Sequence, residues 1–235
     1  MTRPLLAALL LCLCSCDGKG SDTGSEGDAD IDTDADTDPN ACCTHSGLRN
    51  VGGTWDWAWT SDHREATGVS GEWTSSLERD GDSLYMSQEG EQYDSWTGTE
   101  TVWTALFEYR CDVKGAWIVH AETEYTYESA TVDGDGWSDT VYDEPALVMP
   151  RWLGMGTDWT QEAGGTITSE AAIVEFLYVT DYDVVSQAST DVPAGEFETW
   201  VVEWTTSDEV GSLRVAPGVG PVWTGETELR DWSHD

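Results

Sequence analysis

Apolar and polar residues alternate with a period of two along most of this chain, between turns rich in glycine and acidic residues. Trp55, Trp57 and Trp59 share one face of a first segment. The pattern continues through Trp73 to Leu77, and Asp80-Gly81 is a strong hairpin signal before the next apolar run. Alternation of this kind indicates strands with one buried face, joined by tight turns.

Two longer alternating segments follow. The first places Trp103, Ala105, Phe107, Tyr109 and Cys111 on one side. The second begins after a turn at Lys114-Gly115. One of its faces carries Trp117, Val119, Ala121, Thr123, Tyr125 and Tyr127. The opposite face carries His120, Glu122, Glu124 and Glu128. We expect an antiparallel pair here, with a charged, solvated outer face.

Further strands are predicted at about 165–171, 173–180, 182–190, 197–206, 211–216 and 222–230. No segment shows a helical period over three turns. The fold class predicted is therefore all-β: a single, strongly curved antiparallel meander sheet, either a half-barrel or barrel-like.

The N-terminal segment differs from the rest. Arg3 precedes a short apolar run from Leu5 to Leu13, which is too short to span a bilayer and reads as a cleaved signal peptide over 1–15. Leu13-Cys14-Ser15-Cys16 resembles the bacterial lipobox, which implies lipidation of Cys16. Acyl chains such as palmitate would then anchor the chain to the inner or outer membrane of the cell envelope.

Residues 16–40 form an Asp/Thr/Gly-rich stretch with no apolar mass, so we expect a disordered tether ahead of one globular domain at 41–235. The formal net charge of the whole chain is −36. This charge excludes nucleic acid and anionic lipid headgroups as direct partners, which leaves the lipid anchor as the membrane contact.

The cysteines suggest an oxidising compartment. With Cys16 lipidated, we expect a disulfide between Cys111 and either Cys42 or Cys43, because neighbouring cysteines rarely pair with each other without strain. A metal site that includes His45 is the alternative.

Fourteen tryptophans are unusual for a chain of 235 residues. Each buries about 150–250 Å², and several on one open face would exceed the apolar patch that monomers tolerate. Most should therefore fill the inside of the curved sheet, and a minority should line a cavity. The candidates for ligand binding are Trp55, Trp57, Trp59 and Trp117.

One segment suggests calcium. Asp133, Asp135, Asp139 and Asp143 partly match the spacing of a calcium-binding loop, with Gly136 at the turn position. The alternative interpretation is a plain hairpin tip between two strands. No other cofactor is predicted.

Three short motifs resemble those of a group of uncharacterised bacterial envelope lipoproteins. They are Gly52-Gly53-Thr54-Trp55-Asp56-Trp57, then Leu153 to Trp159, and the ending formed by Val192-Pro193-Ala194-Gly195-Glu196-Phe197 with Ala216-Pro217-Gly218-Val219-Gly220-Pro221-Val222. The resemblance implies a curved antiparallel sheet, related to the half-barrels of LolA/LolB-type lipoprotein carriers. It implies no catalytic residue.

These observations predict a lipid-anchored envelope protein without catalysis that holds an apolar or lipid-like ligand in a tryptophan-lined concavity. One alternative is a calcium-dependent surface binding or adhesion module. Another is an envelope glycoside hydrolase that uses paired carboxylates. No nucleophile elbow, zinc-protease motif or phosphate-binding loop occurs.

Overall fold

The computed structural model describes residues 46–130 and 133–233. These residues form twelve strands and one short helix. Their bounds are β1 Thr54–Trp59, α2 Ser61–Thr67, β2 Val69–Asp80, β3 Ser83–Asp94, β4 Thr99–Cys111, β5 Gly115–Glu128, β6 Asp133–Pro150, β7 Asp158–Ser169, β8 Ile173–Val192, β9 Gly195–Thr205, β10 Val210–Ala216, β11 Gly220–Trp223 and β12 Thr227–Ser233.

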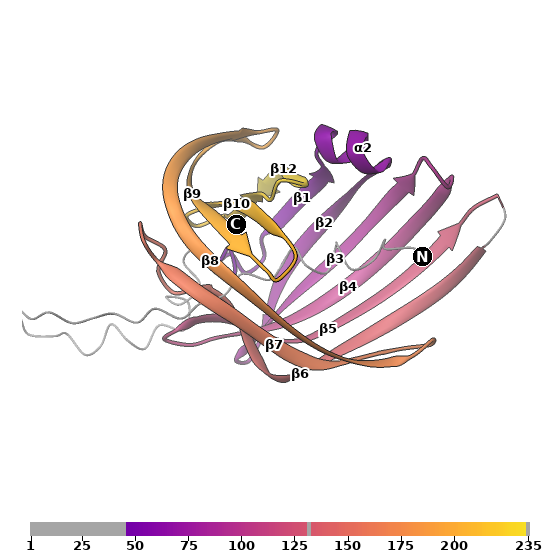
Figure 1. Ribbon diagram of the computed structural model, residues 1–235, viewed down its shortest axis with the longest axis horizontal. Coiled ribbons are helices and arrows are strands. Elements are labelled where there is room, and N and C mark those ends of the chain that lie inside the picture. Colours follow the sequence, from indigo (N-terminus) through magenta and orange to yellow (C-terminus); the bar gives the residue numbers. More distant parts are fainter. Residues whose placement is uncertain (1–45, 131–132, 234–235) are drawn as a thin grey trace, which may run out of the picture.

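The strands form one closed antiparallel barrel in which each strand pairs with its neighbour in sequence. Closure comes from the first and last strands, β1 and β12, which pair from Thr54 opposite Ser233 to Trp59 opposite Thr227. Figure 1 shows β2 to β6 as a broad tilted layer, with β8 curving around the other side. The prediction of an all-β, strongly curved meander is confirmed, and the sheet closes fully.

The strand β8 is a single element where two strands were predicted, at 173–180 and 182–190. The residues between those ranges pair without interruption, with Asp181 opposite Thr205 and Tyr182 opposite Trp204. A register shift at Val184–Ser186 then bends the strand. Bulges of this kind increase twist locally, so one long strand curves without a turn.

The buried residues form two hydrophobic cores. The first core contains Trp55, Trp73, Trp103 and Phe107, and the second contains Trp159, Tyr182 and Val202. The end of β6 separates the two cores.

The last five residues of β6, Ala146–Pro150, are all buried. Ala146 and Val148 belong to the first core, whereas Leu147 and Met149 belong to the second. Because successive side chains point to opposite faces of a strand, this segment contributes to both cores at once.

The helix α2 follows β1 at one end of the barrel (Figure 1). The Thr60 side chain caps its N-terminus by accepting a hydrogen bond from the His63 backbone N–H. At its C-terminus, Gly68 adopts a φ of 74°, a left-handed conformation that glycine takes without strain. Within the described residues, no helix has the length and apolar character needed to cross a membrane.

Several sequence predictions lie outside the described residues: the signal peptide at 1–15, the lipidated Cys16, the tether at 16–40, and Cys42 and Cys43. Cys111, at the end of β4, is disulfide-bonded.

Candidate binding pocket

An apolar pocket of about 70 Å³ lies inside the barrel, between the wall formed by β1 to β3 and the opposite wall from β6 and the β10–β11 turn. Its main apolar lining residues are Trp55, Trp57, Trp73, Met86, Val148 and Val219. The alternating pattern in the sequence explains how the tryptophans meet. Trp57 on β1 lies directly opposite Trp73 on β2, so both side chains point to the same face.

Several polar groups at this pocket are hydrogen-bonded to protein partners. The Trp55 indole Nε1 donates to the Val219 carbonyl at 3.1 Å. The Gln88 amide donates to the Ser75 hydroxyl at 3.0 Å. A ligand in the pocket therefore meets a mainly apolar wall, because these polar groups already have hydrogen-bond partners in the protein.

The tryptophans form a connected group of rings. The Trp57 and Trp73 rings stack with centroids 6.3 Å apart, and Trp73 contacts Trp59 at 5.6 Å and Trp103 at 6.2 Å. Gly90 lies opposite Trp73 on β3, where an added Cβ would come within 2.4 Å of the Trp73 Cβ. This glycine therefore makes room for the rings.

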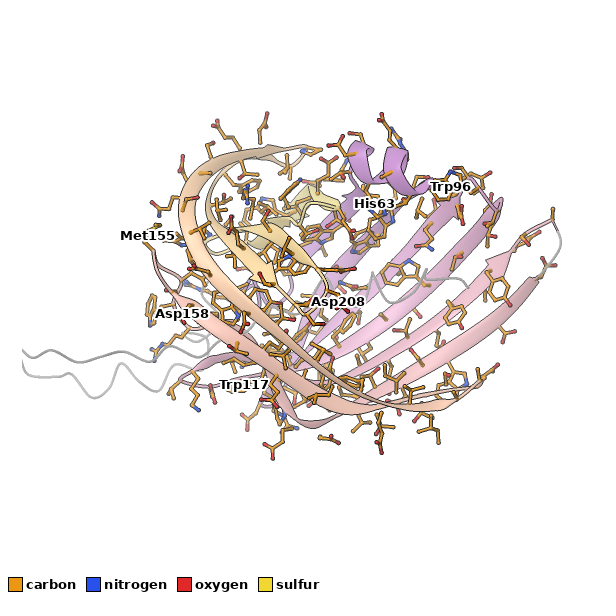
Figure 2. All side chains as sticks on the ribbon, viewed as in Figure 1. His63, Trp96, Trp117, Met155, Asp158 and Asp208 are labelled. Carbon is orange, nitrogen blue, oxygen red and sulfur yellow. The ribbon has the colours of Figure 1, made fainter. Side chains whose placement is uncertain are left out.

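Of the four tryptophans predicted to bind ligand, Trp55 and Trp57 line the pocket, and Trp59 lies beside it against Trp73. Trp117 does not join them, and its predicted position is corrected by the structure. It packs against the second core, and Figure 2 shows it far from His63 on α2.

The reason is a bulge in β5. Tyr109 pairs with Ile118, but the preceding Glu108 pairs with His120, so Val119 is an extra residue. The bulge reverses the alternation, and Ile118 rather than Trp117 shares the first core with Ala121. A strand with an uninterrupted period of two would instead place Trp117 on the same face as Ala121, as the sequence analysis predicted.

The calcium loop predicted from Asp133, Asp135, Asp139 and Asp143 does not form, because all four residues lie on the strand β6. At about 3.3 Å per residue, Asp133 and Asp139 are roughly 20 Å apart along an extended strand. They cannot share one ion. Asp139 instead lies against His120, whose Nε2 is 2.6 Å from the Asp139 Oδ1.

Sequence reasoning missed Met86, Gln88 and Val148 as pocket residues. Met86 lies in the apolar run that follows Asp80-Gly81, but its place in the pocket depends on Val148 of β6 lining the same space, which local periodicity does not report.

No protein-family model, characterised protein sequence or solved structure matches this chain.

Proposed function

We propose that this chain is a lipid-anchored protein of the bacterial envelope that binds an apolar or lipid-like group in its tryptophan-lined pocket, without catalysing a reaction. The anchor part of the proposal rests on the resemblance of Leu13-Cys14-Ser15-Cys16 to a lipobox. The binding part rests on the pocket, and above all on its apolar wall of indole rings, beside which the Trp55 indole and the Gln88 amide are hydrogen-bonded within the protein.

The size of the pocket favours a particular kind of ligand. A cavity of about 150 Å³ lined by apolar side chains takes up benzene. This pocket, at about 70 Å³, fits a smaller group. The end of an acyl chain matches both the volume and the wall, with the remainder of the ligand outside the pocket.

The charge of the chain further narrows the class of ligand that we propose. With a formal net charge of −36, the protein repels an anionic headgroup. We therefore favour a neutral or cationic lipid-like molecule over a free fatty acid.

The lining supports binding rather than chemistry. It consists of aromatic, aliphatic, hydroxyl and amide side chains, and no Asp, Glu, His or Cys is among the described residues that line it. The hydroxyls of Ser75, Thr224 and Thr227 line the pocket, but a hydroxyl becomes an effective nucleophile only with a base beside it, and acid–base catalysis needs a titratable group within reach of the bound molecule.

The proposal is tested by replacing one wall residue with a polar side chain of similar size. Met86→Gln introduces an amide into the pocket, and a bound apolar chain would leave it without solvent. Such a group costs about 1–3 kcal/mol, so we expect affinity for a neutral medium-chain monoacylglycerol to fall by about tenfold or more. Binding is measured through the intrinsic tryptophan fluorescence.

The matched control is Met155→Gln, the same change at a methionine that is 63% exposed and labelled in Figure 2. This variant should bind like the wild type. If the wild type does not bind the monoacylglycerol, or if both variants lose affinity equally, the pocket is not the binding site.

A further inference from the structure

A cluster of three metal-ligating side chains lies on β5 and β6, apart from the pocket. His120 and Glu122 are two residues apart on β5, so both point to the same face. Asp139 on β6 lies directly opposite Glu122. All three side chains are partly exposed on the face that the sequence predicted to be solvated.

The ligand atoms are close enough to hold one ion. The His120 Nε2 lies 2.6 Å from the Asp139 Oδ1 and 3.8 Å from the Glu122 Oε1, and one ligand atom from each residue lies within 4.8 Å of the others. Metal bonds to nitrogen and carboxylate oxygen are about 2.0–2.2 Å, which puts two ligands of one ion roughly 3–4 Å apart. Small side-chain rotations bring the three atoms into this range.

The local charge favours a cation. Two carboxylates directly opposite each other across a strand pair destabilise the pair. Glu122 and Asp139 stand in that relation, and His120 is the group that contacts both.

Space for further ligands is present beside the cluster. Glu122 also lines a shallow hollow of about 440 Å³, together with Glu124, Glu89 and several hydroxyl side chains. An ion held by three protein ligands can thus complete its coordination with water or a ligand from the hollow.

We propose that His120, Glu122 and Asp139 form a surface site for a divalent transition-metal ion of the zinc class. One imidazole with two carboxylates suits zinc, cobalt or nickel better than calcium or magnesium, which prefer all-oxygen ligand sets. The ion joins β5 to β6 next to the point where their register shifts, between Ile118 and His120.

The site is tested by counting bound ions on the full-length protein. Native mass spectrometry with zinc chloride should show one ion fewer bound to His120→Ala than to the wild type. Titration calorimetry with zinc should show Glu122→Gln and Asp139→Asn weakening that one binding event by about tenfold or more. The difference between proteins excludes zinc bound elsewhere on the chain, including the N-terminal aspartates and cysteines.

The chain provides a matched control. Glu72 and Glu91 also face each other across a strand pair, on β2 and β3. Glu91→Gln removes one acidic charge of such a pair and should leave zinc binding unchanged. The inference fails if Glu91→Gln weakens binding as much as Glu122→Gln, if His120→Ala keeps the full count, or if calcium binds the three residues as tightly as zinc. Circular dichroism of each variant checks that the barrel is intact.

Discussion

At the scale of single residues, His63 on α2 shows how burial changes a side chain's chemistry. Its ring stacks on Trp59 with centroids 4.3 Å apart, and its side chain is 11% exposed. Burial lowers the His63 pKa below the usual 6.5, although the nearby Glu226 carboxylate acts in the opposite direction. The folded protein therefore prefers the neutral ring.

This shift predicts a pH dependence of stability. The unfolded chain takes up the His63 proton near pH 6.5, whereas the folded chain does so at lower pH, so the free energy of unfolding falls as pH drops below about 6.5. The variant His63→Phe keeps an aromatic ring on Trp59 and removes the titration. Urea unfolding between pH 7 and pH 5 should show a shallower loss in this variant, with a difference in slope of up to about 1.4 kcal/mol per pH unit. Parallel curves would contradict the assignment.

Residue patterns also mark what the sequence can and cannot predict about the candidate sites. Alternation correctly placed Trp55, Trp57 and Trp59 on one face, since β1 pairs with β2 without a register shift and the Trp57 and Trp59 rings both contact Trp73. It misplaced Trp117, because nothing in the local sequence marks Val119 as the bulge. The spacing of aspartates along the chain placed Asp139 in a calcium loop. Its contact with His120 depends on the register between β5 and β6, which that spacing does not reveal.

At the scale of elements, the buried end of β6 is the segment on which both cores depend. The start of the same strand is difficult to predict from the sequence. The Asp-Gly pairs at 133–136 are typical of a turn, but in the structure they are part of β6. Gly134 and Gly136 instead lie against the Tyr127 and Tyr125 rings, where an added Cβ would come closer than van der Waals contact allows. Local turn signals thus gave way to packing across the sheet.

Truncation of a side chain on this segment tests its role. Leu147 is 6% exposed and belongs to the second core, so Leu147→Ala should lower the free energy of unfolding by about 2–5 kcal/mol through lost burial and a cavity. Val141, on the same strand, is 51% exposed. Val141→Ala should change stability by only about 0.5 kcal/mol or less. Equal effects of the two changes in urea denaturation would mean that the end of β6 is not the shared wall of the cores.

At the scale of the whole molecule, the acidic side chains have few positively charged side chains to pair with. Ten lysines and arginines face 46 aspartates and glutamates over the chain. Two arginine ion pairs, Arg110 with Glu108 and Arg230 with Glu228, each join side chains two residues apart on one strand, and both arginines are more than half exposed. Pairs of this kind stabilise a protein little. Repulsion between like charges therefore dominates the surface electrostatics.

We expect salt to stabilise the fold. Sodium chloride screens charges over about 10 Å at 0.1 M and over shorter distances above that. Raising it from 50 mM to 500 mM should increase the Tm by several degrees, since each kcal/mol corresponds to about 2–4 °C for a domain of this size. Differential scanning calorimetry measures the change, and potassium chloride should act equally. A Tm that stays constant or falls with salt would show that repulsion is not limiting.

The pairing of β1 with β12 has a consequence for how the chain acquires its structure. Thr54 meets Ser233, so the ladder that completes the barrel joins residues from opposite ends of the domain. Contacts so distant in sequence make folding slow, because a long loop must close before any of them form. During synthesis, one edge of β1 pairs with β2 soon after that strand is made, but its other edge has no partner strand until β12 has been made. That interval is when the polypeptide is most exposed to aggregation, and when a chaperone would be of most use.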